Sequence, residues 1–118
     1  MKRSFVYLGL VSFGATEMFV KVGKTDHPEK RVKAYQTHCP GGLSSMYATE
    51  VASNAAAYAA EARLLSAIGR IDGAAFVGGE WVKIPSHALE VAFDLLIQLV
   101  GEPVSVSLDR GRRVANWG

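Results

Sequence analysis

The chain has 118 residues, which suits one domain, and 49% of them are hydrophobic, enough for an ordinary core. Its single cysteine excludes internal disulfides and multi-cysteine zinc sites, and no apolar run of about 18 residues predicts a membrane span. The net charge of +2 is too small to indicate a nucleic-acid partner by itself. The basic N-terminus leads into an apolar stretch without an obvious cleavage site for a secretion signal, so we expect a cytoplasmic protein.

Two alternating segments near the N-terminus predict a β-hairpin. Residues 4–12 and 18–22 alternate in polarity and are rich in β-forming side chains, and residues 13–17 between them have the composition of a turn. If the aliphatic faces of both strands point into the core, Tyr7 and Lys21 point to the opposite face.

Helices and strands then alternate along the chain. Residues 25–28 begin a helix that should run to about residue 38, because short polar capping residues precede a proline there. A third strand is expected over 46–51, a helix capped by Ser53 or Asn54 through residue 68, a fourth strand over 81–84, and a helix from 85 to about 101. The order ββαβαβα predicts an α+β domain over residues 1–101, followed by an extension over 102–118 with a strand-like piece and a basic tail.

Two short strings imitate catalytic motifs without fulfilling them. The string Val22-Gly23-Lys24-Thr25 resembles the end of a Walker phosphate loop, but the required earlier glycine is replaced by Met18 within an expected strand. We therefore do not expect hydrolysis of nucleoside triphosphates. A His38–Cys39 nucleophile pair is not expected either, because adjacent helical residues do not face each other.

Basic residues gather in two places. Within thirteen residues stand Lys21, Lys24, Lys30, Arg31 and Lys33, and near the end stand Arg110, Arg112 and Arg113. Such clusters are usually solvated surface. However, the lysines of the hairpin and those of the following helix could form two walls of one groove, so we treat Lys21, Lys30 and Lys33 as candidate nucleic-acid-binding residues.

Three side chains outside the apolar pattern are candidates for chemistry. Arg31 and Tyr35 lie four apart on one helix face, where the arginine could pack over the ring or a phosphate could lie between the two. Glu61 falls on the stripe of its helix that should be buried, and an unpaired buried charge costs on the order of several kcal/mol. It could pair with Arg31, lie at the edge of the stripe, or bind a metal ion at the mouth of a cleft.

Five short motifs in chain order carry a resemblance to a known family. They are Phe5-Val6-Tyr7, Lys21-Val22-Gly23-Lys24-Thr25, Pro28 with Arg31 and Tyr35, Ala60-Glu61 with Leu64, and Gly79-Glu80-Trp81-Val82. In this order, over residues 5 to 84, they resemble the GIY-YIG nuclease superfamily, in its phage-associated branch with a second motif of Lys-Ile-Gly-x-Thr. The resemblance implies a small antiparallel three-stranded sheet flanked by helices, in the order ββαβα(β)α.

The resemblance also implies a role for each matching residue. Tyr7 would lie near the attacking water, Arg31, Tyr35 and Lys24 would belong to the catalytic site, and Glu61 would hold a single divalent ion, Mg²⁺ or Mn²⁺. Two departures stand out. The tyrosine of the second motif is Lys21 here, which leaves the general base open between Tyr7, Tyr35 and a metal-bound hydroxide. No residue matches the late asparagine of the family, whose region holds Glu80.

The chemistry of phosphodiester cleavage agrees with these roles. The reaction needs positive charge on the developing phosphorane, a metal ion at the leaving oxygen and a base for water. Arg31 with Lys24 would supply the first, and one carboxylate at Glu61 suits a one-metal site that keeps several waters. We therefore expect a metal-dependent DNA endonuclease, with sequence specificity modest or supplied by a protein partner. The alternative is a non-catalytic nucleic-acid-binding or protein-interaction module on the same scaffold, which Lys21 and the missing asparagine favour.

Overall fold

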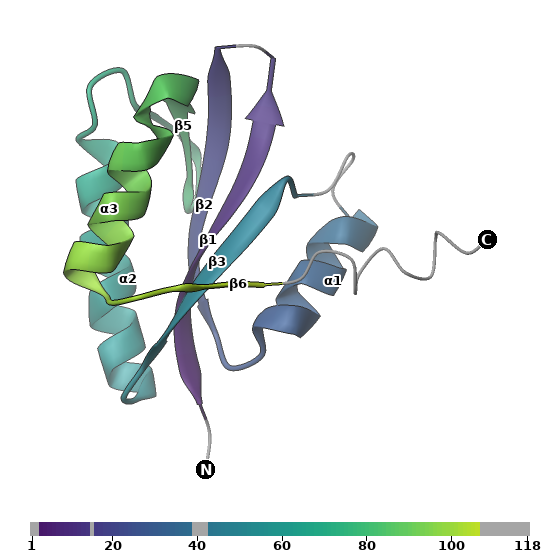
Figure 1. The fold of residues 1–118 in the computed structure, drawn as a ribbon, viewed down its shortest axis with the longest axis vertical. Coiled ribbons are helices and arrows are strands. Elements are labelled where there is room, and N and C mark those ends of the chain that lie inside the picture. Colours follow the sequence, from purple (N-terminus) through teal and green to yellow (C-terminus); the bar gives the residue numbers. More distant parts are fainter. Residues whose placement is uncertain (1–2, 15, 39–42, 107–118) are drawn as a thin grey trace.

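A computed structural model gives the structure of the protein and describes residues 3–14, 16–38 and 43–106. The elements are β1 (Ser4–Phe13), β2 (Glu17–Thr25), α1 (Pro28–His38), β3 (Ser45–Val51), α2 (Asn54–Gly69), β4 (Ala75–Gly78), β5 (Trp81–Pro85), a short 3-10 turn (Ser86–Ala88), α3 (Leu89–Leu99) and β6 (Val104–Ser105). They form an α+β domain, as the sequence predicted (Figure 1). Within these residues no helix has both the length and the apolar character needed to cross a membrane.

The strands form one antiparallel sheet in the order β4-β5-β2-β1-β3-β6. The expectation of a three-stranded sheet is therefore wrong, although β2, β1 and β3 do form its centre. The sheet gains β5 and β4 at one edge and β6 at the other. β5 matches the fourth strand expected over 81–84, and β6 lies in the strand-like piece expected after residue 101. β4 was not predicted, because its four residues are all exposed and no buried face imposes alternation.

The sheet lies between two layers of helix. Figure 1 shows α2 and α3 on one side of the sheet and α1 on the other. Even-numbered residues of β1, such as Val6 and Leu8, pack into a core with α2 and α3, whereas Tyr7 packs on the α1 side with Val32 and Met46. The hairpin prediction is thus confirmed, including the placement of Tyr7 away from the aliphatic core.

Local signals for the helix boundaries hold as well. The Ser53 hydroxyl accepts a hydrogen bond from the Ala56 amide at 3.0 Å and caps α2. Strand β2, in contrast, continues past the predicted end at Val22 to Thr25, so the Gly-Lys-Thr string is strand and not a phosphate loop. Cys39 and the three arginines of the predicted basic tail lie outside the described residues.

Candidate active site

The site lies beside the part of β2 that follows Lys21, where β5 no longer pairs with it. Strand β5 pairs with β2 only as far as Lys21, and the last backbone bond along this edge runs from the Val22 amide to the Glu80 carbonyl at 3.1 Å. Beyond that bond, β1 is the one strand that pairs with β2 in the described part of the chain. Side chains from both faces of the sheet can therefore meet around the uncovered edge.

A hollow of about 250 Å³ opens at this edge. It is lined by phenols, cations and carboxylates: Tyr7, Lys21, Lys24, Arg31, Tyr35, Tyr58, Glu61 and Glu80. All five residues predicted to be catalytic are among them, together with Lys21, which was predicted to bind nucleic acid. The other two predicted nucleic-acid-binding residues, Lys30 and Lys33, are exposed on α1 and do not line this hollow.

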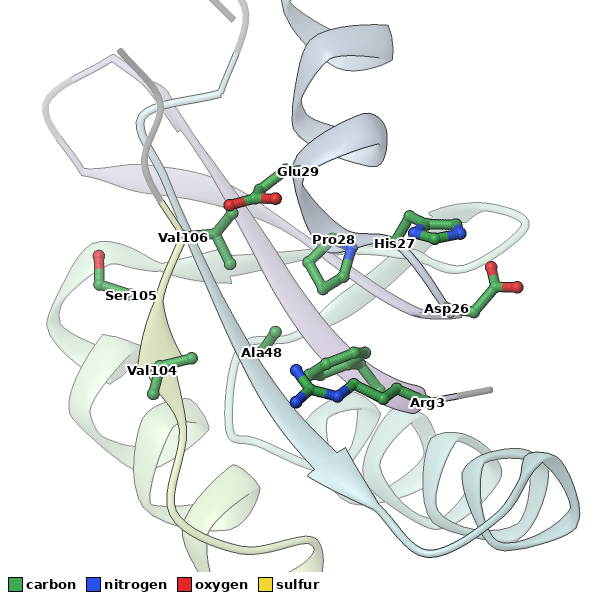
Figure 2. A pocket seen from close by; sticks show the side chains of 10 residues that line it. Arg3, Asp26, His27, Pro28, Glu29, Ala48, Val104, Ser105 and Val106 are labelled. Atoms are coloured by element: carbon green, nitrogen blue, oxygen red, sulfur yellow. The ribbon is translucent and has the colours of Figure 1, made fainter. Parts of the chain in front are cut away.

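A larger hollow of about 620 Å³ lies between the start of α1 and β6 (Figure 2). Its wall includes Arg3, His27, Pro28 and Val104 and none of the predicted catalytic residues. Volume alone would favour it, but reaction chemistry depends on the groups present. We therefore locate the candidate site in the smaller hollow, where every lining side chain is titratable and the pKa values of Tyr7 and Glu61 are raised.

Two tyrosines form the floor of the site. The hydroxyl oxygens of Tyr7, from the centre of β1, and Tyr35, from α1, lie 2.7 Å apart, and their rings meet edge to face. Burial, followed by the hydrogen bond to Tyr35, raises the pKa of Tyr7 far above its usual value, and the charge of Arg31 offsets only part of this rise. Tyr7 is therefore a neutral phenol at physiological pH.

Gly23 makes room for the first of these rings. It pairs with Tyr7 across the β1–β2 ladder, and a Cβ atom there would overlap Cζ and Oη of the tyrosine. The glycine of the second motif is thus explained by the close approach of a side chain to the backbone.

Lys24 of β2 also lines the hollow, next to α2. Its ammonium lies 4.2 Å from the centre of the Tyr58 ring in α2, a cation–π arrangement that holds the charge at the rim. The sequence reasoning missed Tyr58. Its spacing gave a usable signal, because it stands three residues before Glu61 on the same helix face.

Glu61 lies at the edge of the buried stripe of α2, beside Ala57, Ala60 and Leu64, and is half-buried. Burial, followed by the charge of Glu80, raises its pKa, and Lys24 and Lys21 act in the opposite direction. Of the interpretations left open by the sequence, the structure gives Glu61 an edge position facing the hollow, and this position is also compatible with a metal-binding role. No ion pair between Glu61 and Arg31 occurs among the described residues.

Glu80, just before β5, is the second carboxylate of the site. Its Oε1 atom lies 2.8 Å from the ammonium of Lys21, whose side chain is 16% exposed. Lys21 is thus an inner residue of the hollow with a carboxylate partner, not a lysine on an open groove wall. The resemblance to GIY-YIG nucleases puts Glu80 in the region of their late asparagine, but the sequence could not show that Glu80 reaches this hollow.

The donor set can be tested for a metal ion. The described residues contain no group of three or more His, Cys, Asp or Glu side chains that could hold one. Two carboxylates nevertheless face one hollow, and the charge of Glu80 adds to burial in raising the pKa of Glu61, so a cation beside them would be stabilising. Hard oxygen donors suit Mg²⁺ or Mn²⁺, which keep several waters. The residues fit one divalent ion held mainly by Glu61, because Lys21 already engages Glu80.

The sequence was compared with models of known protein families. A family model of the T5orf172 domain matches residues 4–97. The chain belongs to the T5orf172 domain family. The match spans every residue that lines the hollow, from Tyr7 to Glu80, so the candidate site is part of the T5orf172 domain itself. Comparisons with curated proteins and with solved structures gave no match.

Proposed function

We propose that this T5orf172 domain is a metal-dependent endonuclease of the GIY-YIG type that hydrolyses phosphodiester bonds in DNA. One observation carries the proposal. The five residues marked by the family resemblance come from β1, β2, α1 and α2, and all of them line one hollow: Tyr7, Lys24, Arg31, Tyr35 and Glu61. Packing alone gives no reason for two phenols, two cations and a carboxylate to meet at one edge of a sheet.

Positive charge for the transition state comes from two elements. Arg31 of α1 and Lys24 of β2 line the same hollow, and a phosphodiester placed there would lie between a guanidinium and an ammonium. Preorganised donors of this kind stabilise the charge that develops on the phosphorane oxygens. Arg31 is suited to hold two of those oxygens through its planar fork of N–H groups.

The tyrosine pair would handle the attacking water. Since Tyr7 has a strongly raised pKa, it does not serve as a phenolate base. It acts instead as a hydrogen-bonding group that orients the water. The proton of the attacking water would leave through the pair: the Tyr7 hydroxyl would accept it while passing its own proton to Tyr35, and the half-buried Tyr35 would release its proton to solvent.

Glu61 would hold the metal ion on the far wall. When bound there, a divalent ion would stabilise negative charge on the leaving oxygen as a Lewis acid. Glu61 must be ionised for this role, and its raised pKa means that metal binding should weaken as the pH falls.

A cleavage assay tests the proposal. The purified chain should nick plasmid or cut single-stranded oligonucleotides with Mg²⁺ or Mn²⁺ and stop in EDTA. Glu61→Gln should abolish cutting, while Glu102→Gln, which alters an exposed carboxylate outside the hollow, should leave it intact. Cleavage at full rate in EDTA would rule out the metal-dependent reaction.

The second candidate function is a non-catalytic DNA-binding module on the same scaffold. It is favoured by the Lys21–Glu80 ion pair, which puts an ammonium beside the carboxylates that a metal ion would use. This candidate is supported if the chain binds DNA but cuts nothing with any divalent ion, and if Glu61→Gln binds DNA as the unaltered chain does.

A further inference from the structure

A second hollow, of about 530 Å³, adjoins the candidate active site. Lys24 and Arg31 line both hollows, so the two spaces lie on either side of the same pair of cations. The second space also reaches Ser4 of β1 and, at the start of α2, Ser53 and Asn54. Its chemistry therefore differs from that of the first, which combines cations with two carboxylates.

The start of α2 supplies backbone donors to this space. α2 has 16 residues, and its first turn leaves N–H groups without helical partners. Ser53 satisfies the Ala56 amide through its hydroxyl, and its carbonyl accepts from Ala57. Within the described ranges, the amides of Asn54 and Ala55 have no acceptor. Such amides, with the positive end of the helix dipole, attract anions.

Ser4 provides an independent indication that a ligand belongs here. Ser4 is 8% exposed, and its hydroxyl has no hydrogen-bond partner among residues 3–14, 16–38 and 43–106. Buried hydroxyls are nearly always hydrogen-bonded, so an orphan one needs an explanation. Ser4 shares the α2 side of the sheet with Val6 and lines the hollow. A bound oxyanion there would accept a hydrogen bond from its hydroxyl.

The charges of the hollow are compatible with an anion. Lys24 and Arg31 contribute two positive charges, and Asp26, which also lines the space, contributes one negative charge while having an interaction of its own. The balance is +1, because 2 − 1 = 1, before the helix dipole is counted. Both cations also line the first hollow, so this positive charge is shared with any anion that occupies that hollow.

We propose that the second hollow binds a backbone phosphate of the DNA strand, adjacent to the phosphodiester in the first hollow. The proposal rests on the proposed function for the occupant of the first hollow. Lys24 and Arg31 then contact two neighbouring phosphates, and the strand runs from the Tyr7–Tyr35 pair toward the start of α2. The subsite is a positioning device, since it fixes which phosphodiester faces Glu61.

The test is the binding of a short single-stranded oligonucleotide in EDTA, so that cleavage plays no part. Ser53→Asp keeps a capping oxygen but places a negative charge at the start of α2, and Ser53→Asn keeps a cap of similar size without the charge. Ser53→Asp should bind at least tenfold more weakly than Ser53→Asn. The salt dependence of its log affinity should fall by about one unit, as for one lost phosphate contact. Ser66→Asp, on the exposed side of α2, controls for added charge.

Ser4→Ala separates a binding role from a structural one. Removing an orphan buried hydroxyl should leave the melting temperature equal or higher. If that hydroxyl donates to a phosphate, the same variant should lose about threefold in affinity for the oligonucleotide. Equal affinities of Ser53→Asp and Ser53→Asn, or unchanged affinity in Ser4→Ala, overturn the subsite.

Two further measurements identify the ligand. Amide resonances of Asn54 and Ala55 should shift at lower concentrations of oligonucleotide than of inorganic phosphate. The reverse order would mean a site for free phosphate and overturn the strand assignment. If the chain cuts no DNA but Ser53→Asp weakens binding as expected, the proposed nuclease function is refuted and the phosphate subsite is retained. A chain that cuts DNA without that effect refutes the subsite alone.

Discussion

The ammonium of Lys21 lies 2.8 Å from Oε1 of Glu80, inside the hollow that also contains Glu61. Lys21 also lowers the pKa of Glu61, which burial and Glu80 raise. The lysine thus acts as a built-in counter-ion for two carboxylates. Lys21 stands where the second motif of the GIY-YIG nucleases, which the sequence resembles, has a tyrosine.

The first prediction follows from this arrangement. Lys21→Met removes one positive charge beside both carboxylates, so affinity for Mn²⁺ should rise on the order of tenfold. Calorimetric titration would measure it. Lys83→Met is a matched control, because Lys83 pairs with Glu17 away from the hollow. An affinity unchanged from that of the unaltered chain would mean that Lys21 does not compete with a metal ion.

The second prediction concerns pH and stability. The folded-state pKa of Glu61 is raised, so its contribution to stability is fully present below the unfolded-state pKa and is lost as the pH rises through the folded-state value. Glu61→Gln should therefore melt at a higher temperature than the unaltered chain at pH 7 without metal. The difference should vanish in acid, and Glu102→Gln should show no such pattern.

Added Mn²⁺ should invert that ranking. A ligand that binds the folded state alone raises the melting temperature, so the unaltered chain should gain and Glu61→Gln should not. Equal gains in both would place the metal away from Glu61.

The sequence predicted those parts of the site that follow from periodicity. Alternation along β1 put Tyr7 opposite the aliphatic face, and a spacing of four put Arg31 and Tyr35 on one side of α1. Helical periodicity also puts Tyr58 on the face of Glu61, but no periodicity could bring Glu80 to these residues. The place of Glu80 depends on where β5 stops along β2, and tertiary packing fixes that point.

The absence of a buried face explains why a strand of the six-stranded sheet was not predicted. The central hairpin and β3 have buried faces and hence a visible pattern, whereas β4 joins through backbone hydrogen bonds while its side chains stay exposed. Phe76 and Val77 are residue types common in strands, but without a buried face residues 75–78 show no alternation that would predict one.

The third prediction separates catalysis from binding at Arg31. Removing one preorganised donor to a developing oxyanion typically lowers turnover by about 100- to 1,000-fold. Arg31→Ala should therefore reduce the cleavage rate far more than the affinity for DNA, in single-turnover assays alongside binding measurements. Arg63→Ala, an exposed arginine on α2, is the control. Equal losses of rate and affinity would reassign Arg31 to substrate binding.

The fourth prediction tests the space under Tyr7. Gly23→Ala would force the buried tyrosine ring to move, and such overpacking should lower the free energy of unfolding by about 1–3 kcal/mol. Gly9→Ala is the matched control in the neighbouring strand, because its Cβ would lie 3.3 Å from Cδ2 of Leu43, the end of a side chain that can shift. Denaturant melts would compare them, and equal losses would contradict the proposed role of Gly23.

The last prediction concerns Lys30 and Lys33, three apart on the exposed surface of α1 and outside the hollow. If this surface continues the DNA path, each phosphate contact releases counterions, and log affinity falls with log salt by about one unit per contact. Replacing both lysines with Gln should flatten that slope by up to about two units and weaken binding to all sequences alike. An unchanged slope would make them ordinary solvated charges. Truncation after Asp109, which removes the arginines of the basic tail, should then flatten the slope instead.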